Sequence, residues 1–155
     1  MRKKRVYKKQ YKADAIHGRV DLGRLINYVM RDGKKSVAEK QIYLALERIK
    51  EATKEDPLVV FARAIENASP ILEVASRRVG GANYQVPREV TPVRKFILAL
   101  RWIVDAAKSR KGKPISEKLA DEIILAAKNE GNAIKKKQDT HRMAEANRAF
   151  AHFAK

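Results

Sequence analysis

Apolar residues recur every three or four positions in six stretches of the chain, and this is the spacing of one face of an α-helix. The strongest pattern runs from Val93 to Ala107. The opposite face of that stretch carries Arg94, Lys95 and Arg101. We therefore predict helices whose apolar faces lie within residues 22–29, 38–49, 58–68, 93–107 and 119–127, followed by a C-terminal helix of about 133–150.

Residues with strong positional preferences mark the ends of these helices. Ser36 and Glu39 have the spacing of a capping box, in which each side chain bonds a free backbone N–H of the first turn. Asp56 is a good N-cap residue, and the proline that follows it, Pro57, suits the first position of a helix. We predict that the first helix stops at Asp32-Gly33, and similar reasoning places boundaries at Ser69-Pro70, Thr91-Pro92, Ser116 and Gly131.

The predicted C-terminal helix divides its length between two kinds of side chain. Lys135, Lys136 and Lys137 form a basic run in its first half. An apolar line follows, which we expect to pack against the rest of the protein, and it comprises Met143, Ala146, Ala149, Phe150 and Phe153.

The segment of about 72–90 breaks the helical pattern and predicts a β-hairpin. Its first half alternates in residues 74–77, and Gly80-Gly81 then supplies a turn that tolerates positive φ. Pro87 cannot donate a ladder hydrogen bond, so its strand belongs at the edge of a sheet. A hairpin of two strands, projecting from the helices as an arm, satisfies both conditions.

Together these elements predict a mainly α fold, in which a single-domain bundle of about six helices carries a protruding two-stranded β-hairpin arm. The 155 residues suffice for one hydrophobic core, and 45% of them are apolar. The chain has no cysteine and no apolar run long enough to span a bilayer, so we expect a cytoplasmic protein without membrane contact.

Charge points to the partner of this fold. Thirty-five Lys and Arg residues against eighteen acids give a formal net charge of +17, an imbalance that a polyanion would neutralise. The first 19 residues carry one acid, Asp14, and we predict a basic extension that becomes ordered on binding RNA, with Tyr7 and Tyr11 able to stack on bases. Its candidate RNA-binding residues are Arg2, Lys3, Lys4, Arg5, Lys8 and Lys9.

The predicted arm carries the strongest candidates for RNA contact. Arginine binds phosphate with two parallel hydrogen bonds, and a thin hairpin offers Arg77, Arg78 and Arg88 little core to cover. The alternative is that they only keep the arm soluble. Tyr84 is equally consistent with stacking on RNA and with packing across the hairpin. On the helices we expect RNA contact from Arg94, Lys95 and Arg101, and core packing from Trp102.

Two other classes of function remain open at this point. A two-stranded arm with proline and arginine also occurs in architectural proteins that bend DNA, although those are usually symmetric dimers. An enzyme acting on RNA is the third class. The sequence offers no nucleophile with a base, no paired carboxylates and no metal-ligand spacing, since His17, His141 and His152 are scattered. We expect no catalysis, metal or cofactor.

Several motifs resemble the bacterial family of the seventh small-subunit ribosomal protein, in the same order along most of the chain. The resemblance implies binding to the three-prime major domain of small-subunit ribosomal RNA, early assembly of the subunit head, and a position near exit-site transfer RNA and messenger RNA. It also implies the ninth and eleventh small-subunit proteins as neighbours. The matching segments are residues 30–35, 76–81, 84–87, 92–94, 100–102, 134–137 and 141–147.

This resemblance completes the list of expected site residues. Two groups of basic residues join the ribosomal RNA contacts, namely Lys34 with Lys35 and Lys135 with Arg142. The residues expected near transfer RNA are Gly80, Gly81, Tyr84, Lys136 and His141.

Overall fold

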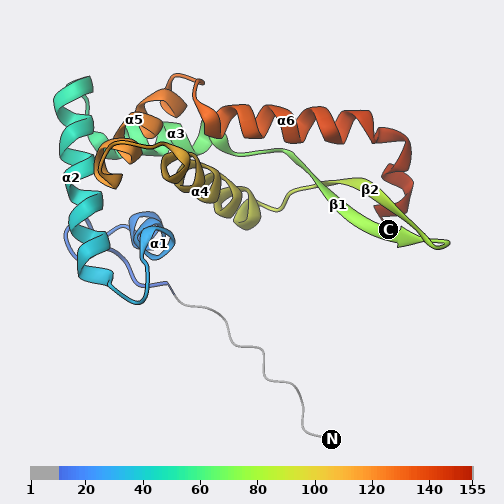
Figure 1. The fold of residues 1–155 in the computed structure, drawn as a ribbon, viewed down its shortest axis with the longest axis horizontal. Helices are drawn as coiled ribbons and strands as arrows, with labels where there is room; N and C mark the ends of the chain where they lie inside the picture. Colours follow the sequence, from blue (N-terminus) through green and yellow to red (C-terminus); the bar gives the residue numbers. More distant parts are fainter. Residues whose placement is uncertain (1–10, 155) are drawn as a thin grey trace, which may run out of the picture.

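The computed structural model describes residues 11–154 and confirms a mainly α fold with a β-hairpin (Figure 1). The predicted residues Arg2, Lys3, Lys4, Arg5, Lys8 and Lys9 lie outside the described part. The elements, in chain order, are α1 (Val20–Val29), α2 (Lys35–Thr53), α3 (Pro57–Ala68), β1 (Leu72–Val79), β2 (Ala82–Glu89), α4 (Pro92–Ser109), α5 (Ile115–Ala127), α6 (Asn132–Ala146) and the 3-10 helix η1 (Arg148–Ala154).

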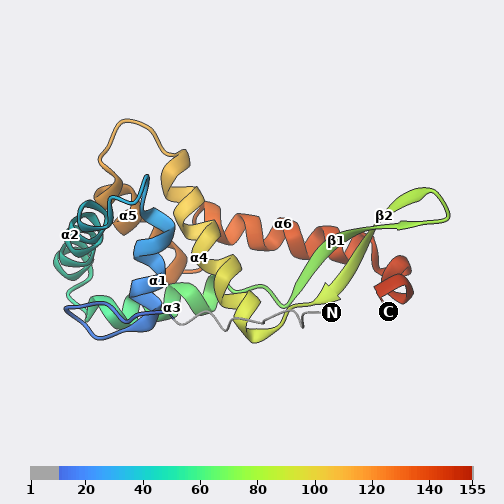
Figure 2. The ribbon, with the colours of Figure 1, turned by 90° about the horizontal axis from the view of Figure 1, so that it is seen from below.

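The molecule has two regions, which we call the body and the arm. The body comprises α1 to α5, which gather at one end of the structure, and the arm is the hairpin β1–β2, which extends away from them. Helix α6 begins in the body and runs beside β1, so that η1 lies against β2 near the far end of the arm (Figure 2). Residues far apart in the sequence therefore meet along the arm.

The core lies in the body and has the composition that the helical spacing predicts. Leu22, Ile42, Phe61 and Ile103 are among its fully buried side chains, and they come from α1 to α4. Leu119 of α5 is also buried there. Burial of each large apolar side chain stabilises the fold by about 1.5 to 3 kcal/mol, so the body supplies most of the stability. Trp102 packs against this core, as predicted.

The arm has the predicted hairpin geometry. Its antiparallel register runs from Leu72 opposite Glu89 to Val79 opposite Ala82. The connection consists of Gly80-Gly81 with φ values of 56° and 91°. Two consecutive residues with positive φ follow the right-handed twist of the strands, and glycine adopts this conformation without steric cost.

The boundary at Ser36 differs from the prediction, whereas the one at Asp56 is confirmed. Helix α2 begins at Lys35, because the preceding Asp32-Gly33 turn has positive φ and lets the Lys35 N–H donate to the Gly33 carbonyl oxygen at 2.8 Å. The capping box is therefore absent, and Glu39 instead pairs with Lys35 at 3.6 Å. Asp56 caps α3 by accepting a hydrogen bond from the Leu58 N–H at 2.9 Å.

The boundaries of the later helices also differ in detail. Thr91 occupies the N-cap of α4, but its side chain makes no capping hydrogen bond. Ser116 lies inside α5, whose N-cap is Pro114. Helix α5 ends at Ala127, because the chain already turns at Asn129 with φ 61°, and Gly131 is the N-cap of α6 rather than the end of α5.

Several predicted packing positions are exposed instead. Val93 is 66% exposed and Met143 is 47% exposed, and each lies near the end of its helix. Ala62, Ala146 and Ala149 are exposed as well. The C-terminal helix ends at Ala146 rather than at about residue 150, because the chain turns at Asn147 into η1.

Candidate nucleic-acid interface

The segment of residues 11–19, predicted as part of a binding-ordered extension, is instead docked on the body. Asp14 is 5% exposed, and it accepts hydrogen bonds from the Tyr43 hydroxyl at 2.6 Å and the His17 N–H at 2.9 Å. The segment also passes close to α1, where a Cβ on Gly23 would lie 2.4 Å from the Lys12 carbonyl oxygen. Glycine at position 23 permits this approach.

The contacts of Asp14 also shift its pKa and that of Tyr43. Burial opposes ionisation of Asp14, but the hydrogen bonds from Tyr43 and from backbone N–H groups outweigh it and lower the pKa of Asp14. Burial and the hydrogen bond to Asp14 raise the pKa of Tyr43 to about 12. Asp14 therefore anchors residues 11–19 to α2 through Tyr43.

A cationic hollow lies in the body where α1 and α4 end and α2 and α5 begin. It has a volume of about 370 Å³, and its apolar wall includes Met30 and Ile115. The charged residues that line it are Arg31, Lys34, Lys108 and Lys118. Lys34 therefore lies at this basic hollow, while its neighbour Lys35 stands in the ion pair with Glu39.

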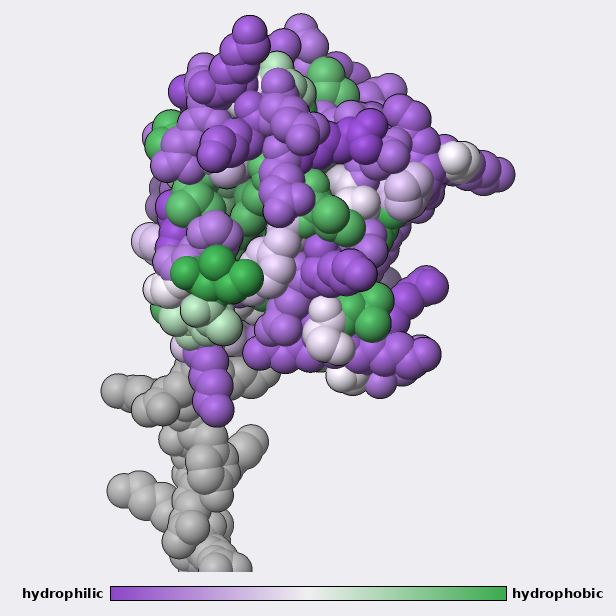
Figure 3. Space-filling view, turned by 90° about the vertical axis from the view of Figure 1, so that its left-hand side faces the viewer, coloured by the Kyte–Doolittle hydropathy of each residue, from purple (hydrophilic) through white to green (hydrophobic). Residues whose placement is uncertain are grey.

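The end of the body formed by α2 has a different character. Figure 3 shows a surface that is hydrophilic for the most part, with apolar residues scattered among the polar ones. Arg48 and Arg63 of α2 and α3 are paired with Glu117 and Glu55, at 2.8 and 3.1 Å. Opposite charges alternate in this part of the body, which makes it a weaker site for a polyanion.

The base of the arm holds a cluster of two arginines on one buried carboxylate. The Glu73 side chain is 9% exposed and pairs with Arg88 at 2.5 Å and with Arg94 at 2.7 Å. Both arginine side chains are about half exposed, at 51% and 48%. The cluster fixes β1, β2 and the start of α4 to one another, and it keeps one net positive charge at the surface. Since Glu73 lies directly opposite Arg88 in the hairpin register, a cross-strand charge pair was the signal that the sequence prediction missed.

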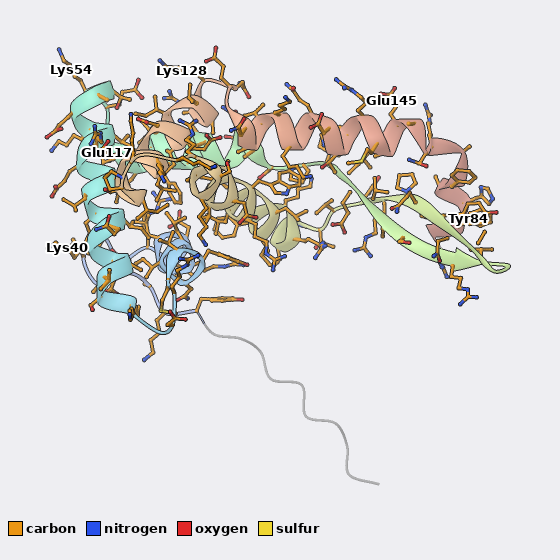
Figure 4. All side chains as sticks on the ribbon, in the orientation of Figure 1. Lys40, Lys54, Tyr84, Glu117, Lys128 and Glu145 are labelled. Carbon is orange, nitrogen blue, oxygen red and sulfur yellow. The ribbon has the colours of Figure 1, made fainter. Side chains whose placement is uncertain are left out.

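The outer half of the arm is covered on one side by the C-terminus. The Tyr84 ring lies 5.1 Å from the Phe150 ring and 5.4 Å from the Phe153 ring, between centroids. Arg77, which lies opposite Tyr84 in the register, donates a hydrogen bond to the Phe153 carbonyl oxygen. Figure 4 shows Tyr84 near the far end of the arm, beside the 3-10 helix η1. Tyr84 thus packs against η1, a third role beside the two considered from the sequence.

The tip and the rest of the outer arm are open. Arg78, Gly80 and Gly81 are exposed, and open space surrounds the position that a Cβ would take on either glycine. A backbone of another molecule can approach the tip without displacing a side chain.

Helix α6 presents cations at the surface and uses two other side chains internally. Lys135, Lys136 and Arg142 are exposed. Lys137 donates to the Asn67 carbonyl oxygen at 2.6 Å, and burial lowers its pKa. His141 Nε2 accepts a hydrogen bond from the Ile71 N–H at 3.1 Å, and burial together with the Lys137 charge lowers its pKa. The neutral imidazole of His141 therefore holds the backbone at the start of β1.

The three predicted RNA-binding residues of helix α4 have different surroundings. Arg101 is exposed, Lys95 is half-buried, and Arg94 is engaged with Glu73. Within residues 11–154, no group of three or more His, Cys, Asp or Glu side chains is placed to hold a metal ion. No helix in that described range is long and apolar enough to cross a membrane.

The sequence is similar to known proteins over nearly its whole length. A model of the family described as Ribosomal protein S7p/S5e matches residues 1–148. The chain belongs to this family. It is 60% identical over 153 residues to the small ribosomal subunit protein uS7 of Thermotoga maritima, covering 99% of both chains. The same protein of Dictyoglomus thermophilum is 59% identical over 140 residues, 90% of both chains, and that of Moorella thermoacetica is 53% identical over 152 residues, 98% of this chain and 97% of the relative.

Membership in the S7p/S5e family confirms the resemblance read from the sequence motifs. The protein is a structural constituent of the small ribosomal subunit, and it takes part in translation there. Its partners include ribosomal RNA and other ribosomal proteins. The family is non-enzymatic, so the interpretations as an RNA enzyme and as a DNA-bending protein are set aside.

Proposed function

We propose that the protein binds the three-prime major domain of small-subunit ribosomal RNA and nucleates assembly of the subunit head. The observation that carries the proposal is the distribution of exposed cations over two separated regions of one fold. A basic hollow lies in the body, and Arg78 with its neighbours lies on an arm that extends away from it. Two such regions can hold two RNA segments at a fixed separation, which is recognition of a folded shape rather than of a base sequence.

The proposed phosphate contacts divide by what each side chain already does. Arg88 and Arg94 reach the surface from a fixed position on Glu73, so their guanidinium groups are preorganised for RNA. Arg77 is anchored to η1 in the same way. The remaining proposed contacts are Lys34, Lys35, Arg78, Lys95, Arg101, Lys135 and Arg142, and, in the part outside residues 11–154, Arg2, Lys3, Lys4, Arg5, Lys8 and Lys9.

We propose further that the far end of the arm and the adjoining α6 lie near exit-site transfer RNA, with messenger RNA and the ninth and eleventh small-subunit proteins close by. Gly80, Gly81 and Lys136 are exposed and can approach the transfer RNA directly. Tyr84 and His141 act by holding the surface in shape, since each already has a partner within the fold.

A binding titration tests the ribosomal RNA assignment. The protein is titrated at about 150 mM salt against the three-prime domain RNA, an unrelated RNA of equal length and duplex DNA. We expect tight binding to the first alone. Neutralisation of roughly six to ten phosphates predicts an affinity loss of about 10³ to 10⁵ between about 50 and 200 mM salt. Equal affinity for all three ligands would contradict the proposal.

A further inference from the structure

Arg24 of α1 is held in an unusual way for an arginine in this protein. Its guanidinium carbon lies over the Tyr11 ring, 4.5 Å from the centroid, and over the Phe96 ring, 4.6 Å from the centroid. The two rings come from the N-terminal segment and from the first half of α4. Three segments that are distant in the sequence thus converge on one guanidinium, and we call this group the Arg24 stack.

The charge of Arg24 has no acidic partner among the described residues. Its Nε atom is buried without a hydrogen-bond acceptor. Other arginines of the body that are held in place have a carboxylate, for example Arg19 on Asp21 and Arg110 on Glu122, both at 2.5 Å. A buried donor without an acceptor is rare in folded proteins, and each case requires an explanation.

Contact through the faces leaves the edge of a guanidinium available. Aromatic rings attract the cation through its flat faces, whereas its N–H groups donate in the plane of the group. A guanidinium stacked on rings therefore keeps its orientation and its hydrogen-bonding capacity together. An arginine paired with a carboxylate has spent part of that capacity.

The surroundings of the Arg24 stack indicate the class of ligand. Tyr11 is preceded by the basic residues 1–10, and Phe96 follows Arg94 and Lys95 directly. The Tyr11 side of the stack faces solvent, since that residue is 42% exposed. The formal net charge of the chain is +17, so the field around the stack favours an anion such as a phosphate group.

We propose that Arg24 is a phosphate-binding residue for RNA, and that Tyr11 and Phe96 are the positioning residues that fix its guanidinium. The inference rests on the proposed function, because the phosphate belongs to the bound ribosomal RNA. It adds a contact on α1 to those expected from the sequence. Arg24 donates to phosphate oxygens through its two terminal nitrogens, at the end of the guanidinium opposite the buried Nε atom.

The charge-removing variant Arg24→Gln is compared with Lys40→Gln in full-length protein bound to the three-prime domain RNA. Lys40 lies on the outward side of α2, away from the arm, and its variant removes the same charge (Figure 4). Loss of one phosphate contact predicts about five-fold weaker binding at about 150 mM salt for Arg24→Gln, and a salt slope smaller by about 0.7 to 0.9. Lys40→Gln is expected to leave the slope unchanged. Equal slopes for the two variants would overturn the proposal.

Two further variants separate phosphate binding from a structural role. Arg24→Lys keeps the charge and is expected to restore the salt slope, while its affinity stays about two-fold below that of the wild type because the planar fork is lost. Phe96→Leu leaves the charge but loosens its orientation, so we expect a similar two-fold loss with an unchanged slope. If Arg24→Lys shows the reduced slope of Arg24→Gln, the charge is not what binds, and the role of Arg24 is structural.

The outcome for the proposed function is read separately. If the wild type binds the unrelated RNA as tightly as the three-prime domain RNA, the ribosomal RNA assignment fails. The difference in slope between Arg24→Gln and Lys40→Gln on either RNA still decides whether Arg24 contacts phosphate.

Discussion

The body and the arm are stabilised by different interactions. The body closes over fully buried apolar side chains such as Phe61 and Ile103. In the arm, the strongly buried positions are Glu73, Val86 and Pro87, and the hairpin is held by contacts with helices from elsewhere in the chain. This difference teaches that a few contacts with helices hold the arm in place, while a shared apolar core holds the body together.

Three of the contacts that attach the arm lie at separate points along its length. Glu73 binds the arginines at its base, the Ile71 N–H donates to His141 beside the first strand, and Tyr84 packs on the aromatic rings of η1. Two of the three depend on polar groups. We therefore expect arm variants to affect RNA binding more than global unfolding, and body variants to do the reverse.

The largest effect is expected from Phe61→Ala in the body. Phe61 is fully buried, and removal of its ring leaves a cavity that lowers the free energy of unfolding by about 3 to 5 kcal/mol. Denaturant unfolding followed by circular dichroism measures this loss. The exposed Val59→Ala is the matched control on the same helix and is expected to change the free energy of unfolding by less than about 0.5 kcal/mol. A loss below about 1 kcal/mol for Phe61→Ala would remove the contrast between the two regions.

The next effect is on RNA affinity, from charge reversal at Arg77 and Arg78. Two phosphate contacts are lost, which predicts roughly 30-fold weaker binding at about 150 mM salt. The melting temperature is expected to change little, because these side chains cover no core. Reversal of Arg63, which is paired with Glu55 on the body, serves as the control. Unchanged affinity for the arm variant would show that the arm does not bind RNA.

A smaller effect on stability is expected from Glu73→Gln. The substitution leaves Arg88 and Arg94 without their carboxylate, and we expect a loss of about 1 to 2 kcal/mol, since both arginines are half exposed and remain hydrated. Amide hydrogen exchange should accelerate in β1 and β2 and stay unchanged in α2. Equal acceleration in both places would show that the cluster stabilises the whole fold instead of the arm.

The contact between Tyr84 and η1 is expected to contribute less. Phe150→Leu removes an aromatic pair, which lowers stability by about 0.5 to 1.5 kcal/mol and frees η1 from the arm. Limited proteolysis should then cleave the chain after Asn147 faster than in the wild type. Met143→Leu, at an exposed position of α6, is the control. Unchanged cleavage would mean that the hydrogen bond from Arg77 is enough to hold η1.

The smallest effect is a dependence on pH at the junction of arm and α6. The pKa of His141 is lowered in the folded protein, so the unfolded chain binds the proton more readily. The contribution of His141 to stability is therefore fully present above the ordinary histidine pKa of 6.5, and it decreases as the pH falls below that value. His141→Asn should flatten this part of the stability profile. A profile unchanged by this substitution would contradict this role of His141.

Local signals in the sequence predicted the elements that depend on local geometry. The Gly80-Gly81 turn and the Asp56 cap were predicted correctly because their residues act on backbone groups within a few positions. The prediction of a capping box at Ser36 was wrong, although that motif is also local. A competing local feature, the turn at Asp32-Gly33, starts the helix two residues earlier, with Lys34 instead of Ser36 as N-cap.

The contacts that fix the arm could not be predicted in this way. Tyr84 meets Phe150 and Phe153 only because α6 runs beside the hairpin, and nothing near Tyr84 in the sequence records that path. Arg24 was missed for the same reason, since its two rings come from separate segments. The roles of Lys34, Arg78, Arg101, Lys136 and the other cations proposed to contact RNA stay predictions.

Helix α6 gives the protein a mechanical property. Its first turn is buried in the body through Ala133 and Ile134, and its last turns lie against the arm. Its 15 residues make a rod of about 22 Å, so a tilt of about 3° at the body displaces the other end by about 1 Å. A small tilt of α6 where it leaves the body therefore gives a larger displacement at its other end, beside the arm.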